Sequence, residues 1–436
     1  MCGIVGIFDR NLDKNEINKT INSLNTLQNH RGPDENNVYI DQDISFAMGS
    51  TRLAILDIKY GSQPLISSDG RYSLVYNGEI YNAPELRINL INKGIHFVTA
   101  NSDTEVLFNK LIYEGIESIS EVNGMFAFAF YDSYEKKLIL SRDRVGIKPL
   151  YFYNKNNCFL FASEIRTIIS HRNFSKELNL QSLFHYTSLM YIPNEETIYK
   201  NINKIDPGSF LIIDLKDNIQ KKNYWFDLDF NIDNNKSREF WLEKTNDVVK
   251  KSIKNSTISD VPFATLLSSG VDSSIIVNCL KQINNIELNT HTLGFDNNSE
   301  YESINELDTA STFAKELKSN HTSMIYNENI FREELLNMVL SMGEPYGGGL
   351  PSWAIFKSIS SKFKMALSGT GADEIFGSYG KWKRLLPLQF VGKKTNKYWF
   401  NKNLFEHRYY LTDKIKKNKI FNNNFSNCLQ TSDLMF

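Results

Sequence analysis

The sequence contains few cysteines, and those it has are scattered. Cys2, Cys158, Cys279 and Cys428 form no Cys-x-x-Cys pair and show no zinc-type spacing to histidine. Neither a disulfide framework nor a zinc site is therefore predicted. No apolar run approaches the roughly 20 residues needed to span a bilayer. The N-terminus also lacks the basic start and long apolar core of a signal peptide. We expect a soluble, cytoplasmic protein without a membrane partner.

An excess of charge of either sign is also missing. The 49 basic and 50 acidic residues give a formal net charge of -1. The one short basic run, residues 414–419, is interpreted as a solvated helix face, so no nucleic-acid partner is expected. What the chain does contain is 436 residues, 41% of them hydrophobic. That length and composition predict two packed domains.

The first half has the pattern of a layered α+β domain. Short apolar or alternating runs predict strands at residues 4–8, 73–76, 125–131, 137–141 and 159–162. Helices are predicted at residues 16–28 and 102–113. A polar stretch follows, and we divide the chain into a first domain at residues 1–212, a linker at 213–238 and a second domain at 239–436.

The second half alternates strands with helices. Strands are predicted at residues 263–267, 291–295 and 364–367, with helices ending at residue 281 and covering residues 301–318. The loops SSGVDSS (268–274) and SGTGADE (368–374) each follow a strand. This alternation predicts a doubly wound parallel sheet, whose ligands bind outside the carboxyl ends of the strands.

Cys2 becomes the first residue once Met1 is removed. Its own α-amino group would then lie within reach as a base, as in nucleophiles that use an N-terminal amine. A cysteine at position two is uninformative alone, but MCGIVGIF, STRLAILD, YNGEIYN and SDTEV occur together and in order. These segments resemble the glutaminase domain of class II amidotransferases. The segment RDRVGIKPLYF (142–152), interpreted as mainly structural, points to asparagine synthetase relatives.

This resemblance implies an αββα sandwich of the N-terminal-nucleophile type, with Cys2 as the catalytic residue. Arg52 would hold the α-carboxylate of glutamine and Asp103 its α-ammonium group. The Asn77 amide and the Gly78 N–H would form the oxyanion hole, and Glu79 would complete the turn that contacts the substrate. Each residue could also have a purely structural role. Arg52 could form a surface ion pair, Asn77 and Gly78 a tight turn, and Asp103 a helix N-cap.

The two Gly/Ser loops suit phosphate groups. Backbone N–H groups before a helix can cradle phosphate oxygens, and Asp272 and Asp373 could share a Mg²⁺ ion. The two loops resemble those of the ATP-pyrophosphatase domain of asparagine synthetases, and no Walker A motif is present, so cleavage between the α and β phosphates is implied. The resemblance implies that ATP binds Leu266, Ser268, Gly270, Asp272, Ser273, Leu293, Ser368 and Gly369. Leu266 and Leu293 could equally be core strand residues.

Three features depart from the family pattern. Ser269 replaces a glycine, which would weaken ATP binding if that position needs a positive φ. Thr370 replaces an acidic residue at the expected acceptor site, and a threonine cannot act as a base near neutral pH. Only 63 residues follow Asp373, without the family's Arg-x-Pro-Phe-Leu-Asp segment and later lysine, so the second domain is expected to be incomplete.

The leading prediction is a glutamine-hydrolysing asparagine synthase that uses ATP and Mg²⁺ to amidate aspartate or a related carboxylate, releasing AMP and pyrophosphate. Two alternatives stay open. One is an amidotransferase acting on a sugar carboxylate, which would suit the threonine at position 370. The other is a truncated nucleotide-binding glutaminase without ligase turnover. A homodimer is compatible with the sequence.

Overall fold

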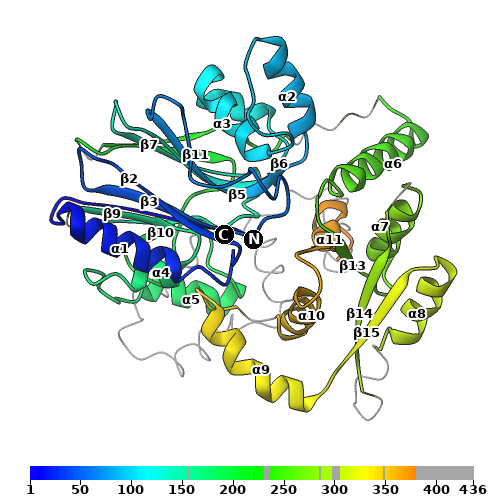
Figure 1. Cartoon of the computed structure of the whole chain (residues 1–436). Coiled ribbons are helices and arrows are strands. Elements are labelled where there is room, and N and C mark those ends of the chain that lie inside the picture. The colour runs from blue at the N-terminus through cyan, green and yellow to red at the C-terminus, as the bar shows by residue number, and fades with distance from the viewer. Residues whose placement is uncertain are drawn as a thin grey trace, which may run out of the picture. The chain divides into compact units, whose positions relative to one another are not determined.

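A computed structural model describes residues 1–379, except residues 156, 218, 230–232, 234, 284–285, 297–304 and 347–348 (Figure 1). Contacts divide the chain into two compact units. The first contains residues 1–176 and 201–262, and the second contains residues 177–200 and those from 263 onward. No helix in the described ranges is both long and apolar enough to cross a bilayer. Cys428, the basic run at 414–419 and part of the helix predicted at 301–318 lie outside the described residues.

The first unit contains two antiparallel six-stranded sheets. One has the order β10-β8-β9-β1-β3-β2, and the other β12-β11-β7-β6-β5-β4. The first sheet consists of β1 (Gly3–Asp9), β2 (Glu35–Ile40), β3 (Phe46–Arg52), β8 (Tyr151–Lys155), β9 (Cys158–Ala162) and β10 (Ile202–Lys204). The second consists of β4 (Leu65–Ile66), β5 (Tyr72–Ile80), β6 (Gly124–Asp132), β7 (Lys137–Arg142), β11 (Ser209–Asp214) and β12 (Ile219–Tyr224).

Helices cover the outer face of each sheet. Helices α1 (Lys14–Thr26) and α4 (Ile165–Ile169) contact the first sheet, while α3 (Asp103–Glu114) contacts the second and packs against α2 (Ala83–Asn92) and the 3₁₀ helix η1 (Ile116–Glu121) (Figure 1). The alternation along β6 explains the layers, because neighbouring side chains of a strand point to opposite faces. Ala127 and Ala129 belong to the core between the sheets, whereas Phe126, Phe128 and Phe130 belong to the core beneath the helices. The predicted αββα sandwich is confirmed.

Part of the segment predicted as a linker forms a strand. Within residues 213–238, β12 pairs along its whole length with β11 at the end of the second sheet. Its polar sequence IQKKNY is typical of an exposed edge strand, where lysines discourage pairing with another chain. Composition therefore could not distinguish it from a linker. Helix α6 (Arg238–Asn255) follows within the same unit, whereas α5 (Leu180–Leu189) groups with the second unit.

The second unit contains a parallel four-stranded sheet with the order β15-β14-β13-β16. Its strands are β13 (Phe263–Leu266), β14 (Asn289–Phe295), β15 (Asn320–Tyr326) and β16 (Met365–Leu367). Its further helices are α7 (Val271–Lys281), α8 (Leu307–Glu316), α9 (Glu328–Ser341), α10 (Leu350–Ser360) and α11 (Ala372–Phe376). Helices α8 and α10 both contact β14 and β15 (Figure 1). The predicted parallel α/β sheet is confirmed. Because β13 lies between β14 and β16, the chain order reverses there, where such sheets bind ligands.

Candidate functional sites

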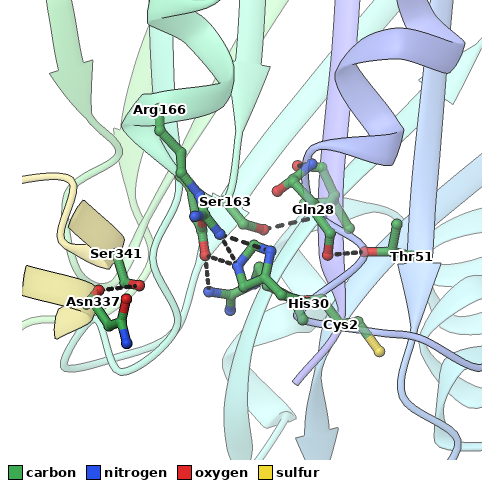
Figure 2. A network of polar contacts seen from close by, with 11 residues as sticks. Cys2, Gln28, His30, Thr51, Ser163, Arg166, Asn337 and Ser341 are labelled. Atoms are coloured by element: carbon green, nitrogen blue, oxygen red, sulfur yellow. Dashed lines mark hydrogen bonds and ion pairs between the residues drawn. The ribbon is translucent and has the colours of Figure 1, made fainter. Parts of the chain in front are cut away.

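Cys2 lies immediately before β1, in the middle of the first sheet. The Ser163 hydroxyl accepts a hydrogen bond from the Ile4 N–H at 3.0 Å, and the Gln28 amide donates to the Ile4 carbonyl at 3.2 Å. Figure 2 shows Gln28, Thr51 and Ser163 grouped around this segment. The Arg31 guanidinium donates to the Cys2 carbonyl at 3.0 Å, and the Cys2 thiol lies 3.9 Å from the Leu53 carbonyl oxygen. The start of the strand is thus held in one position.

Asn77 on β5 is fully buried, yet neither atom of its side-chain amide has a hydrogen-bond partner among the described residues. Leaving a buried polar group unpaired costs about 1–3 kcal/mol, so native proteins rarely do so without a reason. The next residue, Gly78, has no room for a side chain, because an added Cβ would lie 2.7 Å from the Phe126 Cβ atom. An unpaired amide donor beside a glycine backbone is the geometry an oxyanion hole requires.

Asp103 is buried and contacts strand β5. Its carboxylate accepts hydrogen bonds from the Tyr76 hydroxyl at 2.9 Å and from the Ile80 N–H at 3.0 Å. It is not the N-cap of α3, because Ser102 caps that helix. Burial raises the pKa of Asp103. Burial and, second, the nearby Asp103 charge raise the pKa of Glu79 well above its ordinary value. Asp103, which is buried, and Glu79, which is half-buried, are neighbouring carboxyl groups, and such a pair favours a nearby cation.

Burial also affects the groups at the chain terminus. It lowers the pKa of the Met1 α-amino group to about 5 and raises the pKa of the Cys2 thiol. The Cys2 sulfur interacts electrostatically with Tyr76 and Glu79, which flank Asn77 and Gly78 on β5. The predicted nucleophile, the predicted oxyanion-hole residues and the predicted glutamine-binding residues Glu79 and Asp103 thus all lie within one unit.

Lys148 is a candidate that the sequence analysis missed. It is buried, and burial lowers the pKa of its ammonium group while the Glu79 charge acts in the opposite direction. The motif around it has the predicted structural role, because the Asp143 carboxylate accepts from the Ile147 N–H at 2.9 Å and the Lys148 N–H at 2.9 Å. The same turn brings the Lys148 side chain within electrostatic reach of Glu79 and Cys2. A lysine within the apolar segment GIKPLYF was the available signal.

Arg52 is held more tightly than the sequence suggested. Its guanidinium has protein acceptors for four of about five N–H donors, and these acceptors are the Glu35 carboxylate and the carbonyls of Leu56, Asp57 and Ile58. The side chain therefore orders the loop at residues 56–58. A role on the glutamine α-carboxylate stays a prediction.

The SSGVDSS loop joins β13 to α7 in the second unit. The Ser273 hydroxyl lies 2.9 Å from the Ser268 hydroxyl and accepts from the Ser268 N–H at 3.0 Å. The Gly270 N–H donates to the Ser268 hydroxyl at 3.0 Å, and Gly270 is the N-cap of α7. Asp272 lies in the first turn of this helix. The loop is thus a compact Ser/Gly turn at a helix N-terminus.

The SGTGADE loop packs against this first loop. An added Cβ on Gly369 would lie 2.9 Å from the Asp272 Cβ and 3.2 Å from the Ser273 backbone nitrogen. The Ser368 hydroxyl donates to the Thr370 hydroxyl at 3.1 Å. Gly371, with φ +100°, turns the chain into α11, whose first turn contains Asp373. The loops are neighbours because β13 and β16 pair in parallel, which places their carboxyl ends together.

Two further expectations can be compared with this geometry. Ser269 is not among the residues with a positive φ, and its hydroxyl donates to the Glu306 carboxylate at 2.7 Å, so the backbone strain expected there is absent. Leu266 and Leu293 are half-buried and pack against the core cluster of Ala264, Ile355 and Ile359. Their side chains are therefore core residues, which leaves only their backbone for a ligand.

Two family models match the chain. The glutamine amidotransferase domain matches residues 1–225, and asparagine synthase matches residues 244–424. A putative glutamine-hydrolysing asparagine synthetase 2 of Methanocaldococcus jannaschii is 32% identical over 423 residues, which cover 90% of this chain and 78% of that protein. The chain belongs to the asparagine synthetase family.

A second relative in this family is glutamine-hydrolysing asparagine synthetase 1 of Bacillus subtilis. It is 33% identical over 396 residues, which cover 89% of this chain and 60% of that protein. The chain thus spans under two thirds of the length of this asparagine synthetase. A solved structure of the glutamine phosphoribosylpyrophosphate amidotransferase from B. subtilis covers 74% of this chain at 17% identity, with a TM-score of 0.38.

Proposed function

We propose that this chain is a glutamine-dependent amide synthetase, with a glutaminase site in the first unit and an ATP-dependent carboxylate-activating site in the second. The overall reaction converts glutamine, ATP and aspartate into glutamate, asparagine, AMP and pyrophosphate. The observation that carries the proposal is the buried, unpaired Asn77 amide near the Cys2 thiol. The Asn77 amide would be satisfied if it donated a hydrogen bond to an oxygen atom of the substrate. The reaction needs a reduced thiol, which suits the cytoplasm.

In the glutaminase reaction, the Cys2 thiol transfers its proton to its own α-amino group after Met1 is removed. The ordinary pKa of an α-amino group is about 7.7–8.0, so part of the population is neutral near pH 7 and can accept that proton. The sulfur then attacks the carboxamide carbon of glutamine, and the developing oxyanion accepts hydrogen bonds from the Asn77 amide and the Gly78 N–H. The protonated amine returns its proton to the leaving nitrogen, which departs as ammonia. Water then hydrolyses the thioester to glutamate and regenerates the thiol.

Glutamine is proposed to bind through its charged ends. Its α-ammonium group would lie against Asp103 and Glu79, where a positive charge relieves the repulsion between two neighbouring carboxyl groups. Arg52 is proposed to contact the α-carboxylate through its remaining donor. Lys148 would balance the charge of Glu79 when the substrate is absent.

In the synthetase reaction, Ser268, Gly270 and Ser273 would bind the ATP phosphates at the N-terminus of α7. Asp272 and Asp373 would hold Mg²⁺, and they fit that ion because Gly369 allows their two loops to touch. When bound, Mg²⁺ neutralises the pyrophosphate leaving group. Ser368 and Gly369 would contact the ribose or phosphates, and the backbone at Leu266 and Leu293 the adenine. Thr370 lies where acceptor contacts are expected.

A product assay tests this function. The purified chain is incubated with glutamine alone and then with glutamine, ATP, Mg²⁺ and aspartate. We expect glutamate in both reactions, and AMP, pyrophosphate and asparagine in the second only. Intact mass must show that Met1 has been removed. A chain that lacks Met1 but releases no glutamate would refute the glutaminase proposal, and absence of AMP with aspartate would refute the proposed acceptor.

A further inference from the structure

A second cluster of reactive side chains lies at the far end of β1. Asp9 is the last residue of β1 and Cys158 the first residue of β9, and the two are direct partners in the antiparallel register. Directly opposed side chains of neighbouring strands project to the same face, with Cβ atoms about 4.5–5.5 Å apart. Their neighbours Phe8 and Phe159 point the other way, into the core between the sheets. Asp9 and Cys158 therefore face the helical layer on the outside of the first sheet.

His171 completes the cluster from that helical layer. It follows α4, and its N–H donates to the Ile168 carbonyl at 3.1 Å. A ring nitrogen of His171, a carboxylate oxygen of Asp9 and the Cys158 sulfur all lie within 4.8 Å of one another. The exposed fractions of Asp9, Cys158 and His171 are 0%, 1% and 5%. Three chemically different ligand groups thus converge in a site that is closed to solvent.

The His171 ring shows that the cluster is incomplete without a further group. Neither of its ring nitrogens has a hydrogen-bond partner among the described residues. A buried imidazole normally pairs at least one nitrogen, because an unsatisfied buried polar group is destabilising. A cation between the three side chains would give this ring the partner it lacks.

We propose that Asp9, Cys158 and His171 form a binding site for a divalent metal ion of the zinc type. Thiolate, imidazole and carboxylate are the ligands that bind zinc in proteins, and this cluster supplies one of each. A thiolate and a carboxylate also neutralise the charge of the ion, which a closed apolar site requires. Tetrahedral zinc holds its ligand atoms about 3.3–3.8 Å apart, so binding draws the three side chains together by up to about 1.5 Å.

The surroundings of Asp9 suit a ligand. Its Oδ1 atom accepts hydrogen bonds from the Asn11 N–H at 2.9 Å and the Asn11 amide at 3.0 Å. Its Oδ2 atom lies 3.4 Å from the Asn173 amide nitrogen. Such hydrogen bonds orient a metal-binding carboxylate and are a regular feature of zinc sites.

This site is separate from the glutaminase chemistry. Gly3 and Asp9 lie at opposite ends of β1, and a strand of this length spans roughly 20 Å. The metal would connect β1, the start of β9 and the segment after α4. Its effect is therefore on stability, because a metal held only by the folded state adds its binding free energy to folding.

Metal content of the full chain tests the proposal. Protein purified after expression with added zinc is expected to hold about one zinc per chain, and Cys158→Ser and His171→Asn fewer than about 0.1. Cys279→Ser and His96→Asn are the matched controls, since both residues lie outside the cluster, and they should keep the full content. Cys2→Ala should also keep it, which excludes the N-terminal thiol as the ligand.

A spectroscopic measurement on the wild type covers the case in which the cluster variants fail to fold. Cobalt bound at this site is expected to show a thiolate-to-cobalt charge-transfer band and the intense visible bands of tetrahedral Co²⁺. Folded wild type that retains neither zinc nor cobalt overturns the proposal. So does a folded Cys158→Ser variant with undiminished zinc content.

Discussion

Asn77 is the residue whose environment most needs a functional explanation. Its amide is fully buried on β5 and makes no hydrogen bond to any residue that the structure describes. Gly78 beside it is constrained by contact with β6. Stability alone favours an apolar side chain at this position. The proposed role as an oxyanion-hole donor gives this amide a function.

Replacing this amide separates its effect on catalysis from its effect on folding. We expect Asn77→Ala to lower the glutaminase kcat by about 100- to 1000-fold, as loss of one oxyanion-hole donor does elsewhere. The melting temperature should change little, because removing an unpaired polar group offsets the small cavity left behind. Steady-state kinetics and thermal melting check both parts. Asn92→Ala, on the exposed surface of α2, is the control. A variant that keeps wild-type kcat would contradict the oxyanion-hole assignment.

At the scale of secondary-structure elements, Glu164 connects the segment after α1 with the turn between β9 and α4. Its carboxylate bonds to His30 at 2.9 Å and Arg31 at 3.0 Å, and Figure 2 shows His30 and Arg166 within this network. Burial opposes ionisation here, but the His30 and Arg31 interactions lower the pKa of Glu164 to about 2. Because Arg31 also donates to the Cys2 carbonyl, this ion-pair network supports the position of Cys2, the proposed nucleophile.

The low pKa of Glu164 predicts a specific acid sensitivity. When the pKa of a carboxyl group falls on folding, the group stabilises the folded protein at pH values above its ordinary pKa of about 4.5. That stabilisation is lost as the pH falls towards about 2. Glu164→Gln should therefore reduce the free energy of unfolding by roughly 3 kcal/mol at pH 7. The difference from wild type should shrink steadily below pH 4.5. Urea unfolding at several pH values measures it.

The control for this measurement is Glu135→Gln. Glu135 pairs with Lys137 on the surface, where an ion pair contributes about 0–1 kcal/mol. Its stability should match wild type throughout the pH range. If Glu164→Gln reduced the free energy of unfolding equally at pH 7 and at pH 2, the pKa assigned to Glu164 would be wrong.

The contact between the two Gly/Ser loops also belongs to this scale. Gly369→Ala would place a methyl group 2.9 Å from the Asp272 Cβ and push the loops apart. We expect AMP formation to fall at least about tenfold, since misplaced catalytic groups lose rate steeply. The glutaminase rate of the same variant should stay at the wild-type level and serves as the internal control. AMP formation at the wild-type rate would show that the loops do not act together.

At the scale of the whole molecule, the proposed function assigns one chemistry to each unit. The proposed glutaminase residues all lie in the first unit and the two Gly/Ser loops proposed to bind phosphate lie in the second. A substitution that inactivates one site should therefore leave the other site active. This separation is the basis for a test with ammonia in place of glutamine.

Cys2→Ala should abolish the use of glutamine and preserve the use of ammonia. Removing a catalytic nucleophile lowers glutamine hydrolysis by about 1000-fold or more. AMP formation with added ammonium, ATP and aspartate should stay within about twofold of wild type, because no reacting group of the second site has changed. Parallel assays of glutamate and AMP provide the measurement. Glutamine hydrolysis that survives in Cys2→Ala would remove the N-terminal thiol from the mechanism.

Local patterns were sufficient for about half of the strands, for the two Gly/Ser loops and for the order of the motifs. Alternation along β1, β5 and β6 and the Gly/Ser turns after β13 and β16 depend on residues close together in the chain, so the sequence by itself determined the two fold classes and the predicted nucleophile. The edge strand β12 was not predicted as a strand, because its polar composition is the same as that of a linker.

Tertiary structure decided what depends on strand register and burial. Only the fold brings Asp9, Cys158 and His171 together. Only the fold buries the Asn77 amide away from any hydrogen-bond partner among the described residues. It also brings Lys148 within electrostatic reach of Glu79. Likewise, the loops at residues 268–274 and 368–374 touch because two parallel strands pair. These contacts join residues far apart in the sequence. Neither composition nor spacing records such distances, whereas the pairing of strands and the exclusion of water determine them.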